Sequence, residues 1–170
     1  LKKSMLHKQY TGNQLVEILK AELIRQTDEE ILIKDILIDS RRLISSNNCL
    51  FFALQSKHND GHKYINDLYK RGIRTFVISR RDFDTSDYKF ANFFLVENTK
   101  DALQHLAAFH RSNFDIPVIG VTGSNGKTVI KEWLFQLLYK DKKIVRSPKS
   151  YNSQIGVPLS VWQMSKFHEL

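Results

Sequence analysis

Short apolar runs alternate with amphipathic stretches along most of the chain, and this alternation predicts an α/β fold. Runs rich in β-branched and aromatic residues predict strands at residues 31–38, 50–54, 74–79 and 93–96. Helical spacing predicts helices after Thr11, over residues 62–71, and from Thr99 to about Ser112. Thr11 and Gln14 have the spacing of a capping box, and Thr99 is the expected N-cap of the third helix.

A second pattern begins after Asn113, where a new apolar run at residues 116–121 leads into a glycine-rich turn. Apolar residues then recur at helical spacing, at Ile130, Trp133, Leu134, Leu137 and Leu138. This stripe predicts an amphipathic helix packed on a sheet, with residues 144–145 in the next parallel strand. We therefore expect a small N-terminal α/β domain, residues 1–113, and the start of a parallel-sheet domain, residues 114–170.

The composition fits a globular protein. The 170 residues are 42% hydrophobic and 26% charged, which is enough for a domain with part of another. No apolar run reaches the roughly 18 residues of a membrane-spanning helix, so no membrane insertion is expected. Cys49 is the only cysteine, which excludes an internal disulfide and fits the reducing cytoplasm, the expected location.

The formal net charge is +8, and a basic surface suits nucleic acid or phosphorylated small molecules. However, the Lys and Arg residues are scattered, and no run of them exceeds two, as at Arg41 and Arg42. A nucleic-acid-binding module would instead show clustered cations with interleaved aromatic residues. We therefore expect no nucleic-acid partner and rank that hypothesis last.

The turn after residues 116–121 has the composition of a phosphate-binding loop. Glycines permit positive φ angles and a close approach of the backbone to a ligand. Successive N–H groups from Gly123 to Lys127 can then surround phosphate oxygens, and the helix that begins near Lys127 adds its positive end. Lys127 can reach the outer phosphates, and the hydroxyl of Thr128 can bind Mg²⁺.

The loop departs from the strict phosphate-loop pattern, which needs glycine at the position of Val121. Residues 122–128 instead fit T-G-[ST]-x-G-K-[ST] and closely resemble the loop of the Mur ligases and their relative folylpolyglutamate synthase. Lys131-Glu132 and residues 152–159 resemble the branch that adds D-alanyl-D-alanine to UDP-N-acetylmuramoyl-tripeptide. The N-terminal part also resembles the family at Asp39-Ser40-Arg41, residues 50–54 and Asp60-Gly61-His62.

The resemblance implies an ATP-dependent amide ligase of three domains that works through an acyl phosphate and uses ATP and Mg²⁺. Residues 1–113 would bind the UDP end of the substrate, and residues 114–170 would begin the ATP-binding domain. The chain would then be an incomplete ligase, inactive alone and monomeric, with UDP-N-acetylmuramoyl-tripeptide and D-alanyl-D-alanine as partners.

The resemblance also assigns site residues. Lys127 is the expected catalytic residue, and Thr128 is the expected Mg²⁺ ligand. The expected ATP-binding residues are Gly123, Ser124, Asn125, Gly126, Lys127 and Thr128. The expected substrate-binding residues are Ser40, Arg41, Asp60, Gly61, His62 and Asn152.

Ordinary roles stay open for several of these residues. Arg41 suits a diphosphate because a guanidinium donates two parallel hydrogen bonds, yet it could be a plain exposed arginine. Asp60 could simply cap a helix, and Asn152 could be a turn residue. The alternative functions are another Mur-type or folylpolyglutamate synthase-like ligase, and a generic P-loop NTPase or kinase, which would need a later Walker-B acid.

Overall fold

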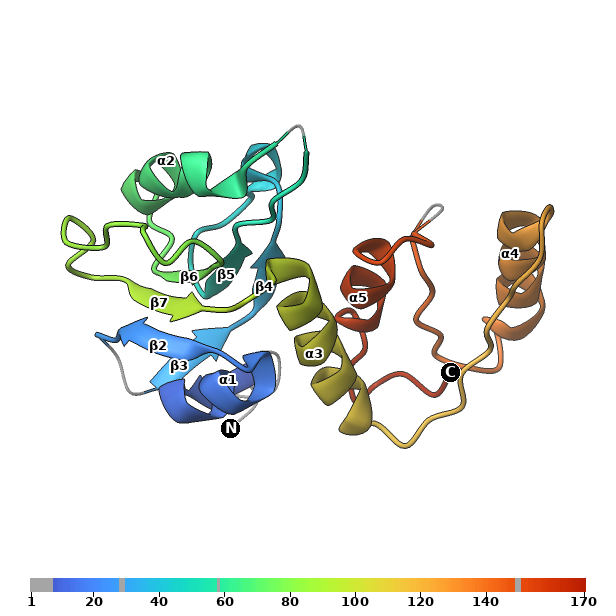
Figure 1. Cartoon of the computed structure of the whole chain (residues 1–170). Coiled ribbons are helices and arrows are strands. Elements are labelled where there is room, and N and C mark those ends of the chain that lie inside the picture. The colour runs from blue at the N-terminus through green and yellow to red at the C-terminus, as the bar shows by residue number, and fades with distance from the viewer. Residues whose placement is uncertain (1–7, 28–29, 58, 149–150) are drawn as a thin grey trace. The chain divides into compact units, whose positions relative to one another are not determined.

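The computed structural model describes residues 8–27, 30–57, 59–148 and 151–170. The chain divides into two compact units, Leu1–His105 and Leu106–Leu170. The helix α3 (Thr99–Ser112) begins in the first unit and ends in the second (Figure 1). We propose a domain boundary after residue 113, as the sequence suggests. This boundary falls at the end of α3, whereas the division between the two compact units falls inside it.

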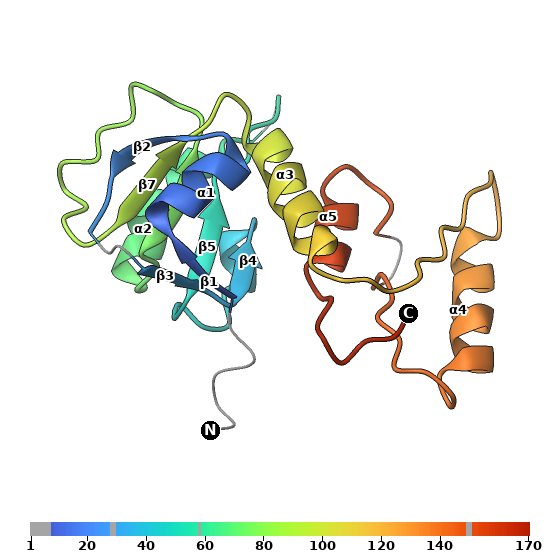
Figure 2. The same ribbon diagram turned by 90° about the horizontal axis from the view of Figure 1, so that it is seen from below.

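The first unit contains a five-stranded sheet in the order β2-β7-β6-β5-β4. Four neighbouring strands are parallel: β4 (Asp35–Leu37), β5 (Cys49–Phe52), β6 (Thr75–Ile78) and β7 (Asn92–Leu95). The edge strand β2 (Glu22–Arg25) is antiparallel to β7, and a separate antiparallel pair is formed by β1 (Lys8–Thr11) and β3 (Glu30–Ile33). The helices α1 (Gly12–Leu19) and α2 (Ile65–Lys70) lie on opposite sides of the larger sheet (Figures 1 and 2). The expected α/β fold class is therefore confirmed.

The centre of this sheet is the core of the first unit. Every residue of β5, β6 and β7 is buried, as expected for parallel strands that are covered on both faces. Phe76 stacks on Phe93 with ring centroids 5.1 Å apart and meets Phe51 edge-on at 6.2 Å. This aromatic packing holds the central strands in register and makes their ends a firm support for the loops that follow them.

Local signals account for the helix starts, with one correction. The Thr11 hydroxyl accepts from the Gln14 amide at 3.1 Å, and the Gln14 side chain accepts from the Thr11 amide at 2.9 Å, so the expected capping box is confirmed. The expected N-cap of α3 was wrong. Asn98 caps this helix by accepting from Lys100 N, whereas the buried Thr99 hydroxyl donates to the carbonyl of residue 53.

The single strand expected over residues 31–38 was wrong, because the chain changes sheets in the middle of this run. Residues before Lys34 pair with β1, and residues after it pair with β5. The amides of Lys34 and Asp35 both donate to the carbonyl of Asn48, at 2.7 and 3.3 Å, which turns the backbone between the two sheets. Residues 31–33 and 36–38 are apolar and are separated only by Lys34 and Asp35, so the pattern does not show that the two parts pair with different sheets.

The helix expected over residues 62–71 begins with a short 3₁₀ segment. The segment η2 (Gly61–Tyr64) leads directly into α2. Gly61 occupies a position where no side chain fits, because an added Cβ would lie 2.7 Å from Leu54 N and 2.8 Å from the carbonyl carbon of Ala53. This close approach lets the Gly61 amide donate to Leu54 O at 2.9 Å and brings the turn back to the end of β5.

The second unit contains the end of α3 together with α4 (Lys127–Leu138) and α5 (Gly156–Val161). The strands expected at residues 116–121 and 144–145 are absent from the described part of this unit. A strand forms only where a neighbour takes up its backbone N–H and C=O groups. Residues 143–145 contact the C-terminal segment through two backbone hydrogen bonds, Val145 N to Leu170 O at 2.9 Å and Glu169 N to Lys143 O at 2.8 Å, and are not assigned as a strand.

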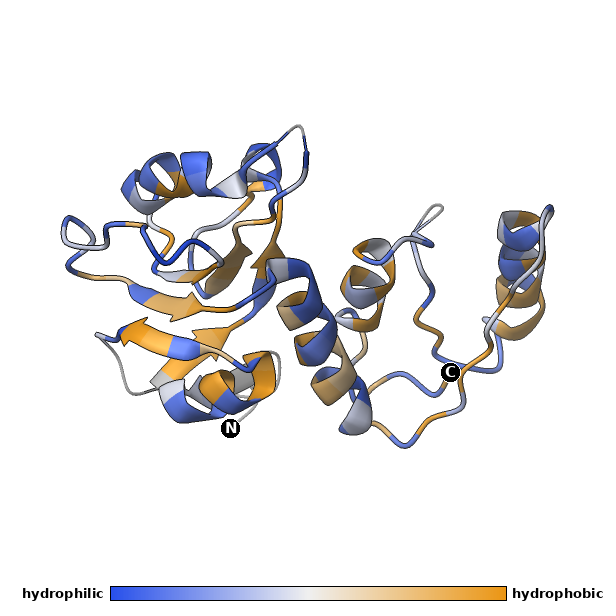
Figure 3. Ribbon diagram, viewed as in Figure 1, coloured by the Kyte–Doolittle hydropathy of each residue, from blue (hydrophilic) through white to orange (hydrophobic). Residues whose placement is uncertain are grey.

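The amphipathic helix expected after the glycine-rich turn is confirmed as α4, but its expected packing on a sheet is not. None of its residues is buried. Ile130, Trp133 and Leu137 of the apolar stripe are 45%, 63% and 73% exposed. Hydrophobic residues gather toward the C-terminal end of α4 in Figure 3. Over the described residues, no helix has both the length and the hydropathy needed to cross a membrane.

We predict that Gly61→Ala destabilises the first unit, because its Cβ would press on backbone atoms that cannot move aside independently. Overpacking of this kind costs about 1–3 kcal/mol. Urea unfolding followed by circular dichroism measures the loss. Gly12→Ala is the matched control, since its Cβ would meet only the end of the Gln26 side chain. Equal midpoints for the two variants would contradict the prediction.

We also predict that Cys49 resists thiol reagents in the folded protein. Burial and then the negative charge of Asp35 raise the pKa of its thiol to about 12, so the reactive thiolate is suppressed at neutral pH. Because the folded pKa is raised, the associated stability is present below the unfolded pKa and is lost as pH rises toward 12. Labelling with a chromogenic disulfide should be slow in buffer and complete in urea; rapid labelling in buffer would contradict this.

Candidate functional site

The expected site residues fall into two groups, one in each unit. The first group lies in the first unit and comprises Ser40, Arg41, Asp60, Gly61 and His62. The second lies in the second unit and comprises Gly123, Ser124, Asn125, Gly126, Lys127, Thr128 and Asn152.

Members of the first group gather at the carboxyl edge of the parallel sheet. Ser40 and Arg41 belong to η1 (Ser40–Arg42), which follows β4. Asp60 and the η2 segment follow β5, and the Gly61 amide holds this turn to the strand end. Because β4 and β5 are parallel, both segments leave the sheet at the same edge. Ligands of open α/β sheets bind at this edge.

Arg41 is exposed and oriented by its neighbour. Its Nε and Nη2 groups donate to the two carboxylate oxygens of Asp39 at 2.9 and 2.8 Å. The side-chain hydrogen bond from Arg41 lowers the pKa of Asp39 to about 2, so this pair stays charged at neutral pH. The Arg41 side chain is 86% exposed, and its remaining N–H groups are available to a ligand. Ser40 is buried, and its carbonyl accepts from Arg71 at 3.1 Å.

His62 is almost fully buried and fastens two strand ends together. Its Nε2 accepts from the Ser79 amide at 3.1 Å, so the proton lies on Nδ1, which donates to Asp60 at 2.6 Å. Burial by itself raises the pKa of Asp60, but the hydrogen bonds from His62 and the charge of Arg80 outweigh it and lower the pKa. The His62 ring therefore supports the turn from inside the protein, and the Asp60 carboxylate is the polar group of this pair nearer the surface.

Sequence reasoning missed Arg80. Its Nη1 lies 3.5 Å from Asp60, and its Nη2 donates to Asp82 at 2.8 Å. Arg80 comes just after the carboxyl end of β6, as Arg41 comes just after that of β4. A cation placed shortly after each of two parallel strands was the signal that could have identified it.

The glycine-rich loop of the second unit has the backbone geometry of an anion site. Gly123 and Gly126 adopt φ angles of 144° and 76°, which side chains other than hydrogen strongly disfavour. Gly126 is the N-cap of α4, and no side chain caps the helix. The first N–H groups of a helix then attract anions. Lys127 Nζ donates to the carbonyls of Gly123 and Ser124, which keeps its ammonium inside the loop.

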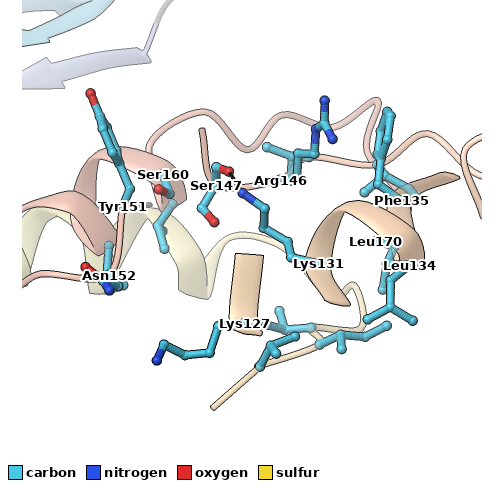
Figure 4. Close-up of a pocket in the computed structure, with 18 of the residues that line it drawn as sticks. Lys127, Lys131, Leu134, Phe135, Arg146, Ser147, Tyr151, Asn152, Ser160 and Leu170 are labelled. Carbon is cyan, nitrogen blue, oxygen red and sulfur yellow. Dashed lines mark hydrogen bonds between the residues drawn. The ribbon is translucent and has the colours of Figure 1, made fainter. Parts of the chain in front are cut away.

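A cavity of about 770 Å³ in the second unit connects this loop with a later segment. Gly123, Lys127 and Thr128 line it from the loop and the start of α4, and Asn152 lines it from the later segment. Figure 4 shows Lys127 and Asn152 among the lining side chains. The structure therefore brings Asn152 into the same cavity as the loop. The loop residues Ser124, Asn125 and Gly126 do not line it.

The cavity also contains residues that we did not expect in the site. Lys131 Nζ donates to Ser147 O at 2.7 Å and lies 3.2 Å from Glu132. Arg146 forms an ion pair with Glu132 and lies over the Phe135 ring, with its guanidinium carbon 3.8 Å from the centroid. Lys131 follows Lys127 by four residues, so both lie on one helix face, and this spacing could have identified it.

The residues present fit a Mg²⁺ ion held mainly by nucleotide phosphates. Mg²⁺ prefers oxygen ligands and usually keeps few protein contacts beside the substrate phosphates. Thr128 lines the cavity and carries a hydroxyl group, which is a suitable oxygen ligand. Across the described ranges, no cluster of three or more His, Cys, Asp or Glu residues forms a metal cage.

Comparison with known proteins places the chain among ligases. No protein-family model matches it. A protein of Synechocystis sp. is 37% identical over 146 residues, which cover 86% of this chain and 31% of the relative. A protein of Bacillus subtilis is 30% identical over 160 residues, which cover 94% of this chain and 34% of the relative. Both are named UDP-N-acetylmuramoyl-tripeptide–D-alanyl-D-alanine ligase.

Solved structures agree with these relatives. MurF from Acinetobacter baumannii has a TM-score of 0.82 at 26% identity and covers 96% of this chain and 35% of its own. MurF ligase from Thermotoga maritima, solved in complex with ADP, has a TM-score of 0.67 at 31% identity. The match covers 79% of this chain and 30% of the Thermotoga chain. The chain thus spans about a third of the length of the relatives that it matches. On the agreement of sequence and structure over most of its length, the chain belongs to the Mur ligase family.

Proposed function

We propose that this chain supplies the UDP-substrate-binding unit and the phosphate loop of an ATP-dependent ligase. The ligase would add D-alanyl-D-alanine to UDP-N-acetylmuramoyl-tripeptide, the reaction named for its curated relatives. The observation that carries the proposal is the loop before α4. The loop has two glycines with positive φ and leads into an uncapped helix start, and its residues Gly123 and Lys127 line a cavity large enough for a nucleotide.

The proposed reaction turns a carboxylate into an amide. A peptide carboxylate oxygen attacks the γ-phosphorus of ATP, ADP leaves, and an acyl phosphate forms. The amine of D-alanyl-D-alanine then attacks the acyl carbon, phosphate leaves, and the amine loses a proton. Phosphoryl transfer depends mainly on positioning and on neutralising charge at the phosphoryl oxygens.

The loop would supply both of these effects. Its amides from Gly123 to Lys127, including those of Ser124, Asn125 and Gly126, would donate to phosphate oxygens. Lys127 would exchange its two loop carbonyls for phosphate oxygens and so neutralise the transferring group. When bound, Mg²⁺ would neutralise further charge on the outer phosphates, and Thr128 would contribute its hydroxyl to that ion. Asn152 would contact the substrate from the far wall of the cavity.

The carboxyl edge of the sheet would bind the UDP end of the substrate. Arg41 would donate its outward N–H groups to the diphosphate, with Asp39 holding the guanidinium in place. Ser40 would support that contact from the strand end. Gly61 would allow the close approach of the neighbouring turn, and His62 would hold Asp60 at the surface of the same edge.

The nucleotide half of the proposal predicts that the chain binds ADP with Mg²⁺ and that Lys127→Met weakens this binding at least tenfold. Hydrogen bonds to charged groups contribute about 1.5–3 kcal/mol, or roughly tenfold or more in affinity. Isothermal titration calorimetry measures both constants. Lys140→Met removes the same charge from an exposed position and serves as the control. Similar affinities for Lys127→Met and wild type would contradict the assignment.

The substrate half predicts saturable binding of UDP-N-acetylmuramoyl-tripeptide, tighter than that of UDP. Arg41→Gln should weaken binding of the tripeptide conjugate about tenfold, because a charge-assisted contact to the diphosphate is lost. Arg42→Gln changes the same charge at the next position and should have a smaller effect, since Arg42 lies 3.9 Å from Asp39 without a bidentate contact. Absence of conjugate binding, or equal losses in the two variants, would count against this site.

A further inference from the structure

Lys131 lies one helical turn after Lys127, and both line the same cavity. Their ammonium groups nevertheless have different partners. Lys127 contacts carbonyls of its own loop, whereas Lys131 donates to the main-chain carbonyl of Ser147, sixteen residues further along the chain. Figure 4 shows Lys131 pointing toward Ser147 and Lys127 leaving the helix in another direction. The two ammonium groups are therefore held by different segments, Lys127 by its own loop and Lys131 by the main chain at Ser147.

The surroundings of Lys131 differ from those of a solvated surface lysine. Its side chain is only 17% exposed. Burial, and then the charge of Arg146, lower the pKa of Lys131, so its ammonium depends on nearby acceptors. Those acceptors are Ser147 O at 2.7 Å and Glu132 at 3.2 Å. A surface lysine would gain little from such an arrangement, because exposed ion pairs are weak.

The contacts fasten one short segment to α4 at two consecutive residues. Arg146 is held through its side chain, by the Glu132 carboxylate and the Phe135 ring. Ser147 is held through its main chain, by Lys131. Only the second contact fixes the path of the backbone itself. The carbonyl of the next residue, Pro148, accepts from Tyr151 N at 3.3 Å, and Tyr151 and Asn152 line the cavity.

We propose that Lys131 is a positioning residue of the nucleotide site, which fixes the backbone at Ser147 so that Asn152 faces the phosphate loop. The inference rests on the proposed function, since it requires that the cavity bind nucleotide. It adds a structural link between α4, whose first residue is Lys127, and the opposite wall of the cavity. Lys131 acts through Asn152 and touches neither the phosphates nor the reacting atoms.

A double-mutant cycle between Lys131 and Asn152 tests this link, with ADP and Mg²⁺ as the probe. Lys131→Met keeps the apolar stem and removes the donor, and we expect about tenfold weaker binding. Asn152→Ala should weaken binding in the wild-type background and have no further effect in the Lys131→Met background, because Asn152 is already displaced there. Lys131→Arg retains a donor that can reach Ser147 O and should restore most of the affinity.

Two further measurements separate positioning from a general loss of stability. Amide hydrogen exchange over residues 145–157 should rise in Lys131→Met, while the urea midpoint matches that of the exposed control Lys140→Met. If wild type binds ADP and Lys131→Met binds it within about twofold, the inference is overturned and the proposed function stands. Multiplicative effects in the cycle would also overturn it. If wild type binds no ADP, the proposed function itself fails.

Discussion

The parallel pairing of β4, β5, β6 and β7 is the constraint on which the first unit depends. Parallel strands cannot be joined by tight hairpins, so each connection leaves one strand at the carboxyl edge and runs back to the amino edge, where the next strand begins. Every segment that follows a strand is consequently delivered to one edge. Arg41, the Asp60 turn and Arg80 come together there because of topology, although up to 39 positions separate them in the chain. Buried aromatic rings between the strands keep that edge rigid.

The second unit achieves its geometry in a different way. Its phosphate loop depends on two glycine conformations and one helix start, which are local features of about ten residues. The strand expected before the loop is not paired in the described residues, yet the loop keeps its form. Local backbone preferences therefore suffice for the loop, whereas the wall that faces it needs contacts such as that of Lys131 with Ser147.

The sequence predicted the features that arise from local chemistry. The capping box at Thr11, the helix from Thr99 to Ser112 and the glycine-rich turn before α4 were all visible, because each depends on neighbouring residues. Strand identity was less predictable. The run at residues 31–38 is apolar on both sides of Lys34 and Asp35, and its division between two sheets depends on the distant carbonyl of Asn48. Pairing partners are a tertiary property that hydrophobic spacing does not encode.

The same distinction applies to the candidate site. The loop residues and Asn152 were named in advance, and the structure places Gly123, Lys127, Thr128 and Asn152 on one cavity. Lys131 and Arg80 were missed as site residues because their partners are distant in sequence. His62 was expected as a contact residue, which stays a prediction, and its buried ring also holds the turn by accepting from Ser79 N.

The exposed stripe of α4 has a spectroscopic consequence. The chain has two tryptophans, and both belong to the second unit. Trp133 projects from the stripe into solvent, whereas Trp162 is buried and packs against His110 with ring centroids 4.9 Å apart. The intrinsic fluorescence of the protein is therefore a sum of one emitter in water and one in an apolar interior. The red part of that spectrum reports on the surroundings of α4, the helix that carries Lys127. The blue part reports on the packing around Trp162 at the end of α5.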